Sequence, residues 1–293
     1  MWQPCRVHHL MTVVLAQDAD LLVEQWPSTL VEGLVQGAVY ALLALACTRA
    51  RGRVDVGQVA GFSLGLFAAY TAFWALGFRP GPTPRVAPAL VLVFLVVGLL
   101  AAVAAAVAAA IAMSRARSLL SGPRWALPLG VGAFAVVHLG IWLLRGAQSE
   151  PMIRPFRPHE LLPDVDDLQL AILVLAAAAI VGAAAATRRG EPPLLVSGGL
   201  AGMAAFLYLL KVPSSAWYLT GISVGLYAVT AVVLGRTARG VVVSAVALGV
   251  VQVAVETVLG SRWWLPFAGA LLVAATGLRL LLAWRRRRAG ATA

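Results

Sequence analysis

The sequence predicts an all-α, polytopic integral membrane protein with about nine transmembrane helices, and three observations support this. Of its 293 residues, 61% are hydrophobic and only 12% are charged. A water-soluble domain carries about 25% charged residues, so this chain lacks the charge to cover a surface exposed to water. Nine apolar stretches reach the roughly 20 residues that a helix needs to cross a bilayer. Lipid offers no hydrogen-bond partners and no barrel-like alternation is present, so these stretches must be helices.

The spans follow one another with short gaps. The first comes after an N-terminal extension, residues 1–26, that lacks the pattern of a typical signal peptide. The third is longer than a perpendicular crossing requires, and its run Ala101–Ala110 allows close helix packing. A proline-rich loop, residues 146–167, separates the fourth and fifth, and a basic tail, residues 285–293, follows the ninth. Residues 27–284 therefore form one transmembrane domain. The predicted spans are 27–48, 54–77, 86–113, 125–144, 168–187, 193–210, 216–235, 241–260 and 263–284.

The basic residues indicate the orientation of these helices. If the first loop, with Arg49, Arg51 and Arg53, is cytoplasmic, nine spans put fifteen basic residues on that side and eight on the other. Cytoplasmic loops carry an excess of lysine and arginine. We therefore expect the N-terminus outside and the C-terminus inside.

Composition and motifs exclude several classes of function. The net charge of +11 includes a single lysine, Lys211, and the arginines fall between apolar runs, which is typical of membrane topology and not of nucleic-acid binding. Cys5 and Cys47 are predicted on opposite sides of the membrane and cannot bond. No metal-binding Cys/His spacing, GxSxG, HExxH or P-loop sequence is present. We expect no catalytic residue, no metal and no cofactor bound by this chain.

Polar residues inside the first span form one stripe. Glu32, Gln36 and Tyr40 are spaced i, i+4, i+8 and so share a helix face. Gly33 and Gly37 lie beside that stripe at GxxxG spacing, which lets another helix approach closely. We expect this face to be directed toward protein or water.

The second span repeats this combination of polar and small residues. It begins with Asp55 and Gln58 and carries a doubled GxxxG pattern at Gly57, Gly61 and Gly65. The pattern predicts a tightly packed helix.

Further polar residues lie in later spans. Gln252 and Glu256 share a face of the eighth span, and His138 lies in the fourth, where we expect a packing role. Polar and ionisable groups in a bilayer are costly and often mark translocation paths. Together with the stripe of the first span, this gives the predicted path or helix interface: Glu32, Gln36, Tyr40, Asp55, Gln58, Gln252 and Glu256.

These residues also have structural alternatives. Glu32 and Glu256 could direct their carboxylates toward the interface from a helix end, or form interhelical hydrogen bonds. Asp55 could pair with Arg51 and Arg53 at the membrane surface.

The segment Leu30–Phe73 carries a regular pattern of glycines, alanines and aromatic residues. It fits N-G-L-x-x-G-x-x-Y-A-L-x-A-L-G followed by S-L-G-Q-A-A-F-F-G-I-G-A-Y, with Glu32 replacing the asparagine and Ala46 the last glycine of the first part. This pattern resembles the permease subunits of bacterial branched-chain amino-acid ABC transporters. The matching residues are Gly33, Leu34, Gly37, Tyr40, Ala41, Leu42, Ala44, Leu45, Gly57, Gln58, Ala60, Phe62 and Gly65.

The resemblance continues more thinly to residue 284, and it departs from the family in one loop. Ser197–Gly202 is similar to the S-G-x-L-A-G entry to a later span. The family's longer cytoplasmic loop before that segment, which docks onto the ATPase, is reduced here to Thr187–Pro193. Either the chain contacts the ATPase through other loops, or it has lost ATP-driven transport. The possible ATPase-facing residues are Arg115, Arg117, Arg188, Arg189, Arg236 and Arg239.

The resemblance implies a transport subunit and not an enzyme. It implies an importer of branched-chain amino acids or similar small polar solutes in the bacterial cell membrane, with a second permease, cytoplasmic ATPases that bind the ATP, and an external solute-binding protein. One alternative is a non-transporting membrane scaffold derived from the same fold. Another is a membrane transferase that uses Asp164, Asp166 and Asp167, although these acids fit a solvated loop better.

Overall fold

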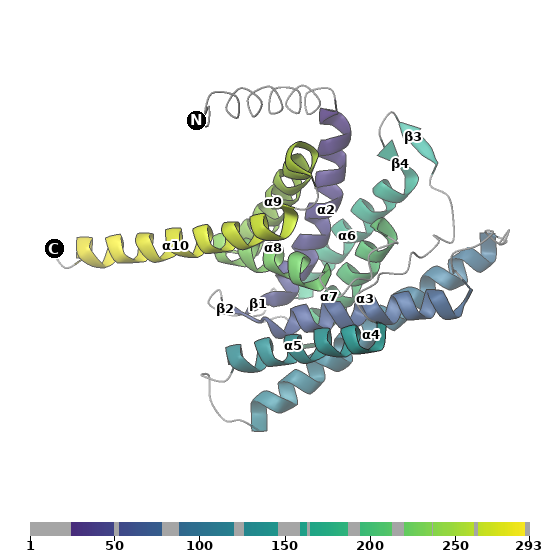
Figure 1. Ribbon diagram of the computed structural model, residues 1–293, viewed down its shortest axis with the longest axis horizontal. Coiled ribbons are helices and arrows are strands. Elements are labelled where there is room, and N and C mark those ends of the chain that lie inside the picture. The colour runs from purple at the N-terminus through teal and green to yellow at the C-terminus, as the bar shows by residue number, and fades with distance from the viewer. Residues whose placement is uncertain are drawn as a thin grey trace, which may run out of the picture.

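A computed structural model gives the all-helical fold that the sequence predicts (Figure 1). It describes residues 25–49, 53–77, 88–119, 126–145, 159–162, 165–186, 194–212, 220–235, 237–260 and 263–290. Each predicted span coincides with one helix, because a long apolar run has no other way to satisfy its backbone in lipid. The helices are α2 (Trp26–Cys47), α3 (Gly57–Ala75), α4 (Pro88–Leu119), α5 (Ala126–Arg145), α6 (Asp167–Ala186), α7 (Leu194–Lys211), α8 (Thr220–Leu234), α9 (Ala238–Leu259) and α10 (Trp264–Gly290).

Seven of these helices are long and apolar enough to cross a membrane: α2, α4, α5, α6, α7, α9 and α10. Helix α8 is apolar but has 15 residues. The chain is therefore a multi-pass membrane protein by helix length and composition. Nine crossings, and the orientation of the two termini, stay predictions.

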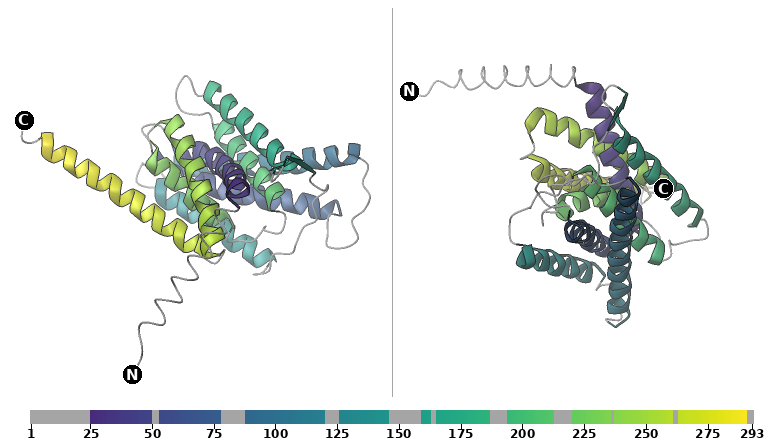
Figure 2. Two further views of the ribbon diagram at one scale, coloured as in Figure 1. Left: turned by 90° about the horizontal axis from the view of Figure 1, so that it is seen from above. Right: turned by 90° about the vertical axis from the view of Figure 1, so that its right-hand side faces the viewer.

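The structure also corrects some boundaries. Helix α4 continues to Leu119, six residues beyond the predicted end at 113, and α10 continues through the predicted basic tail to Gly290. The C-terminal part of α10, yellow in Figures 1 and 2, extends away from the bundle. Two short antiparallel pairs were not predicted: β1 (Thr48–Arg49) with β2 (Arg53–Val54), and β3 (Glu160–Leu162) with β4 (Val165–Asp166).

Helices α2 and α7 form the centre of the bundle. Of their most apolar 18-residue windows, 72% and 67% of the residues are buried, against 17% in α4 and α5 and 11% in α10. Tyr40, Leu42, Leu207 and Tyr227 are among the largest fully buried side chains. The peripheral helices instead direct leucines, valines and tryptophans outward, as expected for surfaces that face lipid or another subunit.

The arrangement of α2 to α5 is repeated by α7 to α10. Helix α7 corresponds to α2, α8 to α3, α9 to α4 and α10 to α5. Each contact of one unit then has an equivalent in the other: α2 with α9 and α7 with α4, α3 with α7 and α8 with α2, and α3 with α5 and α8 with α10. The sequence carries the same repeat, which was not predicted. Leu30–Gly37 (LVEGLVQG) corresponds to Leu195–Gly202 (LVSGGLAG), and Gly61–Ala68 (GFSLGLFA) to Gly221–Ala228 (GISVGLYA). If successive helices alternate in direction as the nine predicted spans require, helices five apart run in opposite directions, and the two units then form an inverted repeat.

Glycines of α2 bring this helix into close contact with α9 of the other unit, as the GxxxG spacing predicts. A Cβ atom added at Gly33 would lie 2.6 Å from the Cα of Val250, and one added at Gly37 would lie 2.6 Å from the Cα of Val246. Gly249 of α9 faces Gly33 and Gly37 in return. Helices α2 and α9 therefore touch backbone to backbone, a packing that only glycine permits.

The equivalent contact, between α7 and α4, is built in the same way. Gly198 and Gly202 of α7 lie against Val107 and Val103 of α4, and a Cβ atom at Gly198 would lie 2.8 Å from the Cα of Val107. The glycine pairs of α2 and α7 thus contact valine pairs with equal spacing. The agreement extends the repeat from sequence and topology to individual contacts.

Glycines of α3 contact the alanine-rich part of α4. A Cβ atom at Gly65 would lie 2.9 Å from the carbonyl oxygen of Ala102, and one at Gly61 would lie 3.4 Å from that of Ala106. The alanine run of the third predicted span therefore packs closely, as expected.

Candidate functional site

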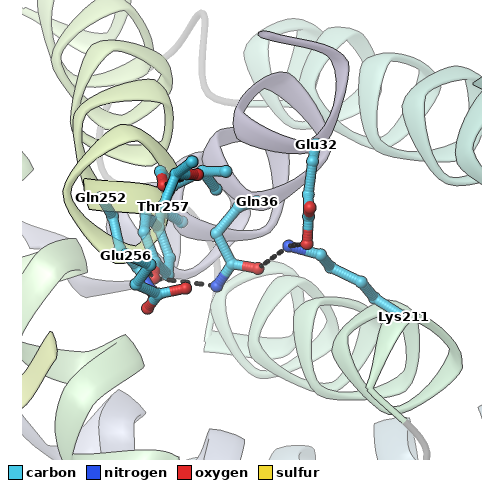
Figure 3. A network of polar contacts seen from close by, with 8 residues as sticks. Glu32, Gln36, Lys211, Gln252, Glu256 and Thr257 are labelled. Atoms are coloured by element: carbon cyan, nitrogen blue, oxygen red, sulfur yellow. Dashed lines mark hydrogen bonds and ion pairs between the residues drawn. The ribbon is translucent and has the colours of Figure 1, made fainter. Parts of the chain in front are cut away.

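A continuous chain of hydrogen bonds connects α7, α2 and α9 near one end of the bundle (Figure 3). The Lys211 ammonium donates to Gln36 Oε1 at 2.6 Å and lies 3.5 Å from Glu32 Oε1. Gln36 Nε2 donates to the Tyr40 hydroxyl at 2.8 Å. We name this set the α2–α7–α9 network; its residues are Glu32, Gln36, Tyr40, Lys211, Gln252 and Glu256.

The chain continues into α9. The Tyr40 hydroxyl donates to Gln252 Oε1, and Gln252 Nε2 donates to Glu256 Oε1 at 2.6 Å. The Tyr40 ring also stacks on Tyr227 of α8, with centroids 5.0 Å apart. Five of the seven predicted path residues are therefore brought together, on the helix faces that the i, i+4 spacing predicted.

Exposure divides the network into two parts. Gln36, Tyr40 and Gln252 are buried, so their hydrogen bonds fasten α2 to α9 inside the bundle. The side chain of Glu32 is 53% exposed and that of Lys211 is 14% exposed. The exposed part of the network is thus its charged edge, and mainly Glu32.

Lys211 is the member that sequence reasoning missed. It is the last residue of α7, one position beyond the predicted span 193–210, and was counted only as a basic residue of the following gap. The sequence did distinguish this residue, because Lys211 is the single lysine in a chain with 22 arginines. The long, flexible stem of lysine lets the ammonium reach back from a helix end to polar partners.

Asp55 and Gln58 belong to a different site. Asp55 lies just before α3, at the other end of the bundle, because its backbone N–H donates to the carbonyl of Cys47, the last residue of α2, at 2.8 Å. The predicted path residues therefore divide into two groups at opposite ends of α2. With the predicted orientation, the α2–α7–α9 network lies at the outer end and Asp55 at the inner end.

Asp55 is buried and forms a two-pronged ion pair with Arg117 of α4. Arg117 NH1 donates to Asp55 Oδ2 at 2.8 Å, and NH2 donates to Asp55 Oδ1. Asp55 Oδ1 also accepts from the N–H of Gly57 at 3.1 Å. Arg51 and the side chain of Arg53, which the sequence suggested as partners, lie outside the described residues. The partner in α4 is 62 residues away in the chain, beyond the reach of a local pattern.

The arginines predicted to face the ATPase are only partly described by the structure. Arg115 and Arg117 lie in the last turns of α4 and Arg239 in the first turn of α9, so none of the three is in a loop. Arg115 and Arg239 are exposed, whereas Arg117 is partly covered by its contact with Asp55. Arg188, Arg189 and Arg236 lie outside the described residues, as do Thr187–Pro193.

Two minor polar sites have structural roles. His138 of α5 is buried, with Nε2 3.3 Å from the Ser63 hydroxyl and Nδ1 2.7 Å from the carbonyl of Phe134, which agrees with a packing role. Asp166 accepts a hydrogen bond from the backbone N–H of Gln169, as a residue at a helix start does, and Asp167 accepts one from the backbone N–H of His159. Asp164 lies outside the described residues. In the part of the chain that is described, no cluster of His, Cys, Asp and Glu could hold a metal ion.

Comparison with known proteins supports the predicted resemblance. Residues 194–276, from α7 into α10, match the family model of the permease component of the branched-chain amino acid transport system. No curated protein matches the chain, and neither does any solved structure. The match, together with seven helices of membrane-spanning length, supports a transport permease subunit over an enzyme.

Proposed function

We propose that this chain is the transmembrane permease subunit of an ABC-type importer for branched-chain amino acids or similar small polar solutes. The match of residues 194–276 to the family model is the observation that carries this proposal. The same resemblance suggests a bacterial plasma membrane, a second permease subunit, two cytoplasmic ATPases and an external solute-binding protein as partners. In this assembly ATP is bound by the ATPases.

The α2–α7–α9 network supports a path for a zwitterionic solute at the outer end of the bundle. Lys211 offers an ammonium to a solute carboxylate, and Glu32 and Glu256 offer carboxylates to a solute amine. Charged groups within a membrane protein are costly, so a group of three at one helix junction favours a functional role. The buried part of the network, Gln36 and Tyr40 with Gln252, holds these groups in place.

Transport would follow alternating access, in which the ATPases move the inner ends of the helices and the path opens to one side at a time. The two polar sites at opposite ends of α2 suit such a mechanism, since each can hold one end of the bundle closed. Asp55 and Gln58 then belong to the inner end.

Uptake into vesicles reconstituted with the partner subunits tests the path. We expect Glu32→Ala and Gln58→Ala to lower uptake of radiolabelled leucine while leaving the amount of protein unchanged. Glu160→Ala is the matched control, because Glu160 is an exposed acid in β3 outside both polar sites. Unaltered uptake in both path variants would remove these residues from the path.

The second candidate is a membrane scaffold that kept the permease bundle without transport. The short segment Thr187–Pro193, where the family has its ATPase-docking loop, favours this candidate. Purification of the tagged chain in mild detergent separates the two. An ATPase subunit that co-purifies supports the importer, whereas a chain that never retains one supports the scaffold.

A further inference from the structure

The C-terminal part of α10 is the least covered apolar segment of the bundle, and it extends away from the other helices (Figures 1 and 2). The side chains of Leu280, Leu281 and Leu282 are 68%, 46% and 39% exposed. Successive residues of a helix point about 100° apart, so these three leucines leave α10 in three different directions. Apolar side chains that are uncovered around a helix need lipid or another protein chain beside them.

Two tryptophans of α10 indicate where this helix meets the membrane surfaces. Trp264 begins the helix, and Trp284, which is 49% exposed, follows 20 residues later (284 minus 264). At a rise of 1.5 Å per residue, this distance is about 30 Å, the thickness of the hydrocarbon core. Tryptophan prefers the boundary between hydrocarbon and water. The residues directly after Trp284 therefore lie at the depth of the lipid headgroups.

Those residues carry a concentrated positive charge. Residues 285–288 are four consecutive arginines, which we name the α10 arginines, and the helix continues past them to Gly290. Four successive helical positions are distributed around the helix. Residues 257–293 contain no aspartate or glutamate. This part of the chain therefore has no acidic side chain of its own to balance the α10 arginines.

Arg288 lies against the interfacial tryptophan. Its guanidinium carbon is 3.8 Å from the centre of the Trp284 ring, a cation–π contact. Arg288 follows Trp284 by four residues, and helical side chains lean toward the N-terminus, so this contact keeps the guanidinium near the depth of the ring. Arg285 is exposed. Guanidinium groups form paired hydrogen bonds with phosphate, which is the charged group found at this depth in a bilayer.

A second copy of the chain fits this segment less well than lipid does. The close helix contacts within this protein depend on glycines, whereas residues 278–288 contain none. A symmetric contact through the same segment would also bring two sets of α10 arginines together, and like charges repel. An anionic phospholipid satisfies both requirements, because its acyl chains cover leucines and its phosphate neutralises arginines.

We propose that the end of α10 is a binding site for anionic phospholipids, whose headgroup phosphates lie among the α10 arginines and whose acyl chains cover Leu280, Leu281 and Leu282. With the predicted orientation, these lipids belong to the inner leaflet. The α10 arginines belong to neither of the two polar sites, so this inference does not depend on the proposed transport function.

Native mass spectrometry of the full chain, purified in a mild non-ionic detergent, measures this binding. We expect phosphatidylglycerol to bind about tenfold more tightly than phosphatidylcholine with the same acyl chains, and this preference to weaken at high salt. Replacing all four α10 arginines with glutamine should reduce the preference to about twofold or less. The matched control replaces Arg49, Arg51, Arg53 and Arg115 with glutamine, which removes the same charge from the same predicted side and should leave most of the preference.

The outcomes separate lipid from other anionic partners. An unchanged preference in the fourfold variant, or an equal loss in the control, would overturn the inference and leave the α10 arginines to an acidic surface of another subunit. Inorganic phosphate that displaces phosphatidylglycerol at equal concentration would also overturn it, since the site would then bind free phosphate. If size-exclusion chromatography shows that the fourfold variant is misfolded, Arg285→Gln combined with Arg288→Gln decides, with an expected loss of about threefold.

Discussion

Two neighbouring glycines of α7 should respond to alanine in opposite directions. Gly198 faces α4, and a Cβ atom there would lie 2.8 Å from the Cα and 3.1 Å from the Cγ2 of Val107. Gly199, the next residue, has nothing within 4 Å of the corresponding position. The two substitutions share helix, depth and chemistry and differ only in what the added methyl group meets.

The magnitudes follow from the geometry. Ordinary carbon contacts begin near 3.4 Å, so Gly198→Ala must separate α7 from α4 by about 0.6 Å, the difference between 3.4 and 2.8 Å. Overpacking of this kind costs about 1–3 kcal/mol. Alanine favours a helix interior over glycine by about 1 kcal/mol. Gly198→Ala should therefore destabilise the protein by up to about 2 kcal/mol, and Gly199→Ala should stabilise it by up to about 1 kcal/mol.

Reversible unfolding in mixed micelles, followed by tryptophan fluorescence, measures both free energies. Both variants are measured at equal detergent ratios, so that the difference between their free energies of unfolding is the quantity compared. Changes of the same sign, or a Gly198→Ala variant as stable as the Gly199→Ala variant, would refute the close contact between α7 and α4.

Three further predictions use the same unfolding measurement. Tyr40→Phe should cost about 1–3 kcal/mol, because it leaves Gln252 Oε1 without its donor and Gln36 Nε2 without its acceptor. Tyr40→Phe combined with Gln252→Leu should cost less than the sum of the two single variants, because both remove the same bond; additive losses would contradict the bond. Glu32→Gln should cost less than about 1 kcal/mol, since its carboxylate is half exposed; a larger loss would mean that the carboxylate is needed for folding. Gly37→Ala should destabilise as Gly198→Ala does if the repeat is real, and a stabilising effect would count against it.

Sequence predicted the helices well because the bilayer leaves few options. Each span required an apolar run of fixed length, and such runs are visible without knowing which helices touch. Helix ends were harder, since polar residues can extend a helix beyond the lipid. Arginines did so in α4 and α10.

Most residues of the candidate site were predicted from the sequence, but their arrangement in space was not. The stripe Glu32, Gln36 and Tyr40 was visible from helical spacing, and the pair Gln252 and Glu256 likewise. That these two sets meet, while Asp55 lies at the opposite end, depends on which helices are neighbours. Spacing within one helix carries no such information, so the partners Lys211 and Arg117 could not be derived from it.

Comparison of the two repeated units distinguishes residues that the helix packing needs from residues that packing does not explain. Glycine pairs that face valine pairs occur in both units, so this framework suffices for a close helix contact. The buried polar residues occur at one of the two equivalent contacts only: where α2 has Gln36 and Tyr40 beside α9, α7 has Ala201 and Ala205 beside α4. The α7–α4 contact packs without them, so packing alone does not explain why polar groups are present at the α2–α9 contact. Since buried polar groups in a membrane protein are costly, this asymmetry is the best physical argument that the α2–α7–α9 network serves transport.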